Sequence, residues 1–163
     1  MKQITEQTWI TEEGLLATIV FTTSGHRCGY VAVPTTHPAY KLNYYTDSIR
    51  LGGISEDTFD QIQTMKLVND ISVHGGLTYS DEHTDTDELW FFGFDAAHCD
   101  DKPDYELARK YYATDIEIIK TLNHRAYVGG ATTRKVRSRA YMTEQCISLS
   151  KQLADIEQQV KDN

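Results

Sequence analysis

Near the C-terminus, apolar side chains alternate at spacings of four and three residues, a pattern typical of a long amphipathic helix with one narrow apolar seam. Ser138 is a suitable N-cap, and the helix is expected to run to about Val160. The seam consists of Met142, Cys146, Leu149, Leu153, Ile156 and Val160. It must pack either on the body of its own subunit or on a second copy. Because the rest of the helix is very polar, the pattern slightly favours a homo-oligomer formed through residues 138–160.

The N-terminal part of the chain predicts strands. Leu15–Thr22 and Cys28–Val33 are short apolar runs with β-branched residues, and Ser24-Gly25 between them is a turn signal. Together these segments predict a hairpin. Further strands are expected over Ile71–Val73 and Glu88–Phe94.

A second helix is expected over Asp104–Leu122, where apolar residues share one face and acidic residues lie near the start. Pro34–Ile54 reads as an irregular loop, and Phe59–Asn69 fits either a helix or a strand. No repeat or linker divides the chain. The fold class is therefore α+β, a single domain over residues 1–163. We expect a small, mostly antiparallel sheet with an N-terminal hairpin, and two C-terminal helices packed on or beside it.

Composition argues against several classes of protein. A length of 163 residues and a hydrophobic content of 40% suffice for a packed core. A net charge of −8 argues against duplex nucleic acid as a partner, since phosphate neutralisation needs a basic face. No apolar stretch is long enough to span a bilayer, and the N-terminus lacks the apolar core of a secretory signal. Three widely spaced cysteines indicate reduced thiols, so we expect a cytoplasmic protein without a membrane partner.

The first candidate site segment is His74-Gly75-Gly76-Leu77-Thr78-Tyr79-Ser80, which follows a predicted strand. Adjacent glycines let the backbone approach a ligand closely, and their amides can form an anion-binding nest. His74, Thr78 and Tyr79 add donors and acceptors that can orient a ribose or a phosphate. The alternative is a glycine turn at a strand end, with His74 hydrogen-bonded for structural reasons.

The second segment, Asp95–Asp101, follows the aromatic strand and contains Asp95 and His98, three residues apart. A carboxylate in that position can orient an imidazole as a general base, or it can simply cap the loop. Together with His74, the pair could supply three ligands to a divalent ion. However, the chain has no HExxH, paired CxxC or HxH pattern, and the sequence therefore assigns no metal and no cofactor. We expect this loop and the glycine turn to meet around a shared cavity.

A basic cluster leads into the C-terminal helix and includes Arg134 and Arg137. Guanidinium groups beside a helix N-terminus suit a phosphate, although the cluster lacks the pattern of a P-loop. The alternative is a basic loop that balances an acidic body.

Several short sequence words, taken together, resemble an uncharacterised family of small proteins encoded by tailed phages and prophages. The words are GHRCGYVAVP, HP, HGGLTYS, WFFGFDAAH.D and a C-terminal Y…EQC..L.KQL. They fall on Gly25–Pro34, His37-Pro38, His74–Ser80, Trp90–His98, Asp100 and Tyr141–Leu153. The family supplies no established catalytic residues. The resemblance implies a non-structural accessory protein in the cytoplasm of the host cell. One recurring task of such proteins is counter-defence against host signals made of modified or cyclic nucleotides.

Three functions fit these observations. The favoured one is an oligomeric binding module that sequesters a small nucleotide-type immune signal, because no catalytic constellation is complete in the sequence. Its ligand-binding residues would be His74, Gly75, Gly76, Thr78, Tyr79, Asp95, His98, Arg134 and Arg137. The alternative is a phosphodiesterase-type hydrolase in which His74 and His98 act as base and acid, oriented by Asp95. The third is an inhibitor that covers a basic site on a host protein.

Overall fold

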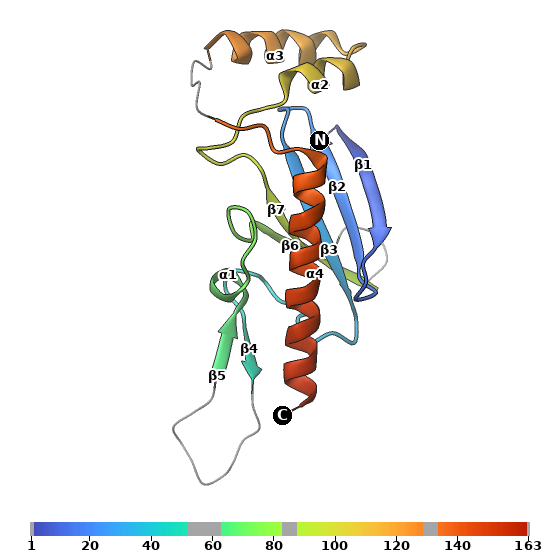
Figure 1. Ribbon diagram of the computed structural model, residues 1–163, viewed down its shortest axis with the longest axis vertical. Helices are drawn as coiled ribbons and strands as arrows, with labels where there is room; N and C mark the ends of the chain where they lie inside the picture. The colour runs from blue at the N-terminus through green and yellow to red at the C-terminus, as the bar shows by residue number, and fades with distance from the viewer. Residues whose placement is uncertain (1, 52–62, 83–87, 129–133, 163) are drawn as a thin grey trace.

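A computed structural model describes residues 2–51, 63–82, 88–128 and 134–162. Its main element is a five-stranded antiparallel sheet in the order β1-β2-β3-β7-β6, shown in Figure 1. The strands are β1 (Gln3–Ile10), β2 (Leu16–Thr22), β3 (Arg27–Pro34), β6 (Tyr79–Asp81) and β7 (Leu89–Asp95). With helices at the C-terminal side, the chain has the predicted α+β fold.

The predicted hairpin is formed by β2 and β3, which pair from Leu16 with Ala32 to Phe21 with Arg27. Gly25 turns the chain between them with a φ of +87°, a conformation that favours glycine. The preceding strand, β1, was not expected from the sequence. It is an edge strand whose central residues, 5–8, are all polar, so it lacks the apolar run that marks β2. Arg27 ties β1 to β3 through an ion pair with Glu6, 2.6 Å long and almost fully buried.

A second, two-stranded sheet corrects part of the sequence interpretation. β4 (Ser48–Leu51) lies in the segment predicted to be an irregular loop, and it pairs with β5 (Gln63–Lys66). The short helix α1 (Leu67–Asp70) follows β5 directly, so the ambiguous segment contains both a strand and a helix. The start of that segment, residues 59–62, lies outside the described residues. Residues 71–73, predicted to be a strand, instead lead as extended chain into the glycine turn.

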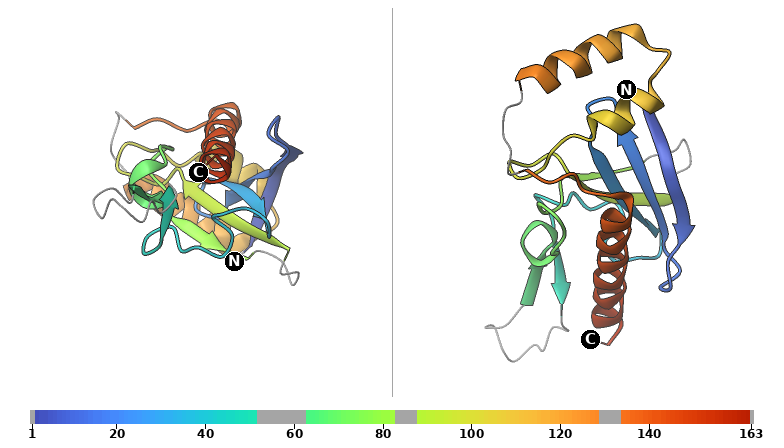
Figure 2. Two further views of the ribbon diagram at one scale, coloured as in Figure 1. Left: turned by 90° about the horizontal axis from the view of Figure 1, so that it is seen from below. Right: turned by 45° about the horizontal axis from the view of Figure 1, so that its top comes forward.

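The long helix α4 (Arg139–Lys161) covers one face of the main sheet, as Figures 1 and 2 show. Ser138 caps it as predicted, its hydroxyl accepting a hydrogen bond from the amide of Tyr141. The seam residues from Met142 to Ile156 are buried in the main core of the same chain. Gly29 of β3 permits this close packing, because a Cβ there would lie 2.8 Å from Sγ of Cys146. The seam thus packs on its own subunit, and the prediction of a homo-oligomer no longer rests on it.

The helix predicted over Asp104–Leu122 is in fact two helices, α2 (Tyr105–Tyr111) and α3 (Ile116–Val128). Asp104 caps α2, and the side chain of Asp115 accepts a hydrogen bond from the amide of Ile118 in the first turn of α3. This second cap starts a new helix where the apolar spacing alone suggested continuity. The two helices lie at one end of the sheet, and with Phe21 they form a small second core (Figure 1).

None of the helices in the described part of the chain combines the length and the apolar character that crossing a bilayer requires.

Candidate functional site

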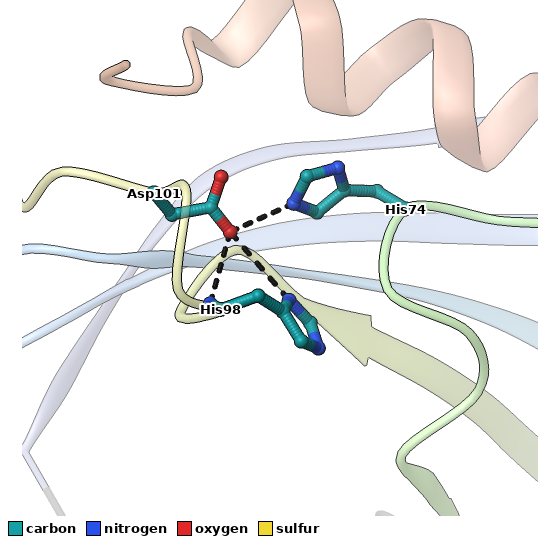
Figure 3. Close-up of side chains that lie close together, drawn as sticks. All are labelled: His74, His98 and Asp101. Atoms are coloured by element: carbon teal, nitrogen blue, oxygen red, sulfur yellow. Dashed lines mark hydrogen bonds and ion pairs between the residues drawn. The ribbon is translucent and has the colours of Figure 1, made fainter. Parts of the chain in front are cut away.

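Three segments that are distant in sequence meet at the buried carboxylate of Asp101. Its Oδ2 atom accepts hydrogen bonds from Nε2 of His74, at 2.8 Å, and from the backbone amide of His98, at 3.0 Å. Its Oδ1 atom accepts one from Nε of Arg137, at 2.7 Å. Figure 3 shows both imidazoles turned toward this carboxylate. The glycine turn, the loop after β7 and the segment before α4 are therefore joined at one point.

Backbone hydrogen bonds join two of these segments, the loop after β7 and the segment before α4, independently of the side chains. Asp101 and Lys135 form an isolated parallel β-bridge, in which the amide of Lys135 donates to the carbonyl of Asp100 and the amide of Lys102 to the carbonyl of Lys135. The loop also closes on itself, because the amide of Asp101 donates to the carbonyl of His98. The basic segment therefore lies directly beside the loop after β7.

The charge of Asp101 is stabilised inside the protein. Burial by itself would raise the pKa of this carboxyl group, but the hydrogen bonds from His74, Arg137 and the His98 amide outweigh burial and lower the pKa to about 2. The side chain is fully buried, so these partners replace the water that a free carboxylate would bind. Asp101 is therefore an anion at any physiological pH.

His74 is held from both sides of its ring. Nε2 meets Asp101, and Nδ1 lies 3.0 Å from the hydroxyl of Tyr141 on α4. The backbone amide of His74 donates to Oε1 of Gln145, one helical turn further along α4. Both ring nitrogens thus have partners, and the side chain is only 12% exposed.

His98 differs from His74, because its ring is closely packed but its Nδ1 atom has no hydrogen-bond partner among the described residues. The ring lies against Gly75, where a Cβ would come within 2.0 Å of the imidazole Cε1 atom. Nδ1 stands 3.5 Å from Oδ2 of Asp101 and 3.9 Å from Oδ1 of Asp95. This nitrogen is buried, yet it makes no hydrogen bond with any residue that the structure describes. The ring as a whole remains 34% exposed.

A cavity of about 130 Å³ opens beside His98. Its polar lining includes His26, Lys102, Tyr105 and Arg134. Burial lowers the pKa of His26 below its ordinary value, so this ring is neutral at neutral pH. Lys102 and Arg134 provide positive charge, and the carboxylate of Asp101, which also lines the cavity, is paired with Arg137. The cavity therefore combines two cationic side chains with a carboxylate that already has a cationic partner.

The chain matches no family model, no curated protein and no solved structure. The interpretation of this site rests on its own geometry, and the resemblance to a phage protein family stays a prediction.

The structure brings several of the predicted site residues together. His74 and His98 have ring centroids 5.4 Å apart, which places the glycine turn beside the loop after β7 as expected. Asp95 lies close to His98, but its carboxylate is occupied by the hydroxyl of Thr78 and the amide of Ala97. It caps the loop, which is the structural alternative considered for this residue, and it leaves the central position to Asp101.

Other predicted ligand contacts are not supported. The amide of Gly76 donates to the carbonyl of Val73, so it closes a turn and is not free for an anion-binding nest. Tyr79 lies in β6 with its ring edge-on to Tyr30, away from the residues that line the cavity. Of the basic cluster, Arg134 lines the cavity and Arg137 binds Asp101, whereas residues 129–133 lie outside the described part of the chain.

Asp101 lies at the end of the predicted segment Asp95–Asp101, but the sequence interpretation gave it no role. It stands three residues after His98, the same spacing that drew attention to Asp95 on the other side, so the pattern did contain a signal. Tyr141 could not be found in this way, and His26, in the predicted hairpin turn, was interpreted as a surface residue. Each reaches the site from an element distant in sequence, and only the packing of α4 and of the β2–β3 hairpin brings them there.

Proposed function

We propose that this protein is a binding module that captures a small nucleotide-type ligand by a phosphate group and sequesters it without turnover. The observation that carries the proposal is the cavity beside His98, because Lys102, Arg134 and the imidazole of His98 all line it. Guanidinium and ammonium groups form strong charge-assisted hydrogen bonds with phosphate oxygens.

The size of the cavity limits what can enter it. Pockets that enclose a whole drug-sized molecule commonly measure roughly 300–1,000 Å³, whereas this cavity has about 130 Å³. It suits a phosphate-sized group, and the rest of a nucleotide would lie across the rim. Tyr105 also lines the cavity and is partly buried, and an aromatic side chain in contact with a nucleotide can stack on its base.

The state of His74 argues against turnover by the predicted pair of histidines. Both of its ring nitrogens have partners, one in Asp101 and one in Tyr141, so proton transfer to or from a substrate would first have to break one of these contacts. The arrangement is better suited to holding the site rigid than to proton transfer. Binding without chemical change is therefore the function that the geometry supports best.

The resemblance supplies the biological setting of the proposal. A small phage accessory protein that removes a nucleotide signal would disarm the host defence that depends on it. Mass spectrometry of molecules that co-purify with the protein from signalling cells would identify the ligand. Recovery of a nucleotide in stoichiometric amount supports this setting, and a preparation free of nucleotide after such growth contradicts it.

Isothermal titration with cyclic and linear nucleotides tests the binding function directly. Because one charged hydrogen bond contributes about 1.5–3 kcal/mol, Arg134→Gln should weaken binding by about 10-fold or more. Lys151→Gln, which removes an exposed charge on α4, is the matched control and should bind like the unaltered protein. The ligand released on denaturation should be chemically intact. Equal affinity in the Arg134→Gln variant would contradict the proposed contact.

A phosphodiesterase-type hydrolase is the second candidate, and one observation favours it. Nδ1 of His98 faces the carboxylates of Asp101 and Asp95, while the ring reaches the cavity, an arrangement that can support a general base. If the protein is an enzyme, His98→Ala abolishes release of cleaved product, whereas His124→Ala, an exposed histidine on α3, does not. Intact ligand after prolonged incubation with the unaltered protein rules this candidate out.

A further inference from the structure

The cluster of His74, His98 and Asp101 has the composition of a metal site. One ligand atom from each residue lies within 4.8 Å of the other two. Oδ2 of Asp101 is 2.8 Å from Nε2 of His74 and 3.5 Å from Nδ1 of His98. We propose that these three atoms bind one divalent transition-metal ion of the zinc type. His98 and Asp101 also line the cavity that holds Lys102 and Arg134, but those two cations are not metal ligands, and the proposal does not depend on a nucleotide being bound.

The donor set suits such an ion. Imidazole nitrogen and carboxylate oxygen are the ordinary ligands of zinc when no cysteine takes part, with bond lengths of about 2.0–2.2 Å. Three protein ligands leave one position open, as in metal sites that also bind water or a substrate atom. Calcium and magnesium prefer sites made of oxygen atoms alone, so two imidazoles argue against them.

A second layer of contacts already orients the proposed ligands. The hydroxyl of Tyr141 lies 3.0 Å from Nδ1 of His74, and Nε of Arg137 lies 2.7 Å from Oδ1 of Asp101. A hydroxyl can accept as well as donate, so Tyr141 can hold the tautomer of His74 that leaves Nε2 free for a metal. Outer partners of this kind fix ring orientation and strengthen metal binding. Asp101 can keep Arg137 on one oxygen and offer the other to the ion.

The Nδ1 atom of His98 is the feature that a purely structural network does not explain. His74, Asp101 and Arg137 satisfy one another without any ion, and they could serve only to join three segments. Nδ1 of His98 is left over, since it is buried beside a carboxylate but makes no hydrogen bond within the described residues. A buried nitrogen without a partner is costly. A metal ion between it and the other two ligand atoms would provide that partner.

The glycine turn also fits this account. Any side chain at position 75 would occupy the space of the His98 ring, because a Cβ would lie 2.0–2.5 Å from three of its atoms. Gly76, with a similarly positive φ, has nothing within 4 Å of the same position. The close approach at Gly75 is therefore specific to the imidazole, and it keeps the ring directed at Asp101.

Zinc titration of the full chain, first stripped with a chelator, tests the proposal. We expect one ion per chain by calorimetry, confirmed by elemental analysis after gel filtration. His98→Ala should weaken binding by about 100-fold or more, and Tyr141→Phe by about 10-fold, since losing even an outer partner commonly costs about 10–100-fold. His124→Ala and Cys99→Ser, which remove an exposed histidine and an exposed thiol, are the controls and should leave the affinity unchanged.

Cobalt substitution gives a second readout on the unaltered protein, so the test survives a variant that fails to fold. The visible bands of a nitrogen and oxygen site without a thiolate-to-cobalt charge-transfer band would support the proposed ligands. A charge-transfer band, absence of stoichiometric zinc, or full zinc affinity in His98→Ala would overturn the proposal. Nucleotide titrations carried out in the presence of a chelator measure nucleotide binding without the metal. Failure of nucleotide binding and failure of metal binding are then separate results.

Discussion

The carboxylate of Asp101 carries its charge almost out of contact with solvent, and three hydrogen-bond donors offset the cost of burying it. Its pKa in the folded chain is about 2, against an ordinary value of 3.8. A group whose pKa is lowered by folding stabilises the protein above its unfolded value and loses that contribution as the pH falls through the folded value. The stabilising effect of Asp101 should therefore disappear between about pH 4 and about pH 2.

Urea denaturation at a series of pH values can detect this effect. The lowered pKa corresponds to about 2 kcal/mol of the free energy of unfolding. Asp101→Asn should be less stable than the unaltered protein at neutral pH, and the difference should shrink as the pH falls toward 2. Other carboxylates also contribute to acid unfolding, so the comparison between the two proteins is the measurement that matters. A constant difference across that range would contradict the assigned role.

Gly75 and Gly76 provide a matched pair of substitutions. Both have positive φ, at +68° and +83°, so alanine strains the backbone at either position. Only at position 75 does the new Cβ also meet the His98 ring. Gly75→Ala should therefore lose about 1–3 kcal/mol more stability than Gly76→Ala, the range typical of overpacking. Thermal unfolding of the two variants checks this, and equal losses would show that the ring is not held there.

These residues also show how far a sequence can predict a site. The glycine turn and the loop after β7 could be found because both interrupt apolar strands with small and polar residues. The choice of Asp101 over Asp95 could not, since both lie three residues from His98. Their roles depend on which carboxylate faces the interior, and that follows from the bridge between Asp101 and Lys135. Such long-range pairing leaves no local signal.

Helix α4 packs on the main sheet through its apolar seam, so substitutions in the seam should lower the stability of the single chain. Leu149 is fully buried in the main core, whereas Ile147 on the same helix is 37% exposed. Truncation of a buried leucine costs about 2–5 kcal/mol, so Leu149→Ala should destabilise the protein by that amount and Ile147→Ala by much less. Denaturant titrations at two protein concentrations measure the stability lost in each variant and show whether stability depends on association of chains. A midpoint that rises with concentration would restore the oligomer interpretation of the seam.

The elements that were predicted well and those that were not differ in one respect. β2, β3 and β7 are apolar runs buried in the sheet, and α4 has a regular apolar seam, so each carries a strong periodic signal. β1 is a polar edge strand, and the break between α2 and α3 depends on a single capping aspartate. Weak periodicity and single-residue caps are the features that sequence patterns describe least well.

The described residues form two cores of unequal size, and the two should open at different free energies. The larger one joins α4 to the main sheet, while the smaller one contains Phe21, Ala108, Tyr112 and Leu122. Several side chains of α3 are exposed, among them Ile116 and Tyr127. Regions with few buried apolar contacts exchange their amide hydrogens through low-energy local opening. Hydrogen exchange measured by mass spectrometry should therefore be fastest in α3 and slowest in β3 and α4, and uniform protection would contradict this.

The position of α4 in the chain has a consequence for biosynthesis. The ribosome makes the main sheet well before α4, so the apolar face formed by β2 and β3 emerges without its cover. The same delay applies to the Asp101 network, because the segment that supplies Arg137 is 36 residues downstream of it. Until that segment has left the exit tunnel, the nascent chain exposes the apolar face of the sheet, and the Asp101 network is incomplete. We therefore expect newly made molecules to be prone to aggregation during this interval, and to complete the Asp101 network only at its end.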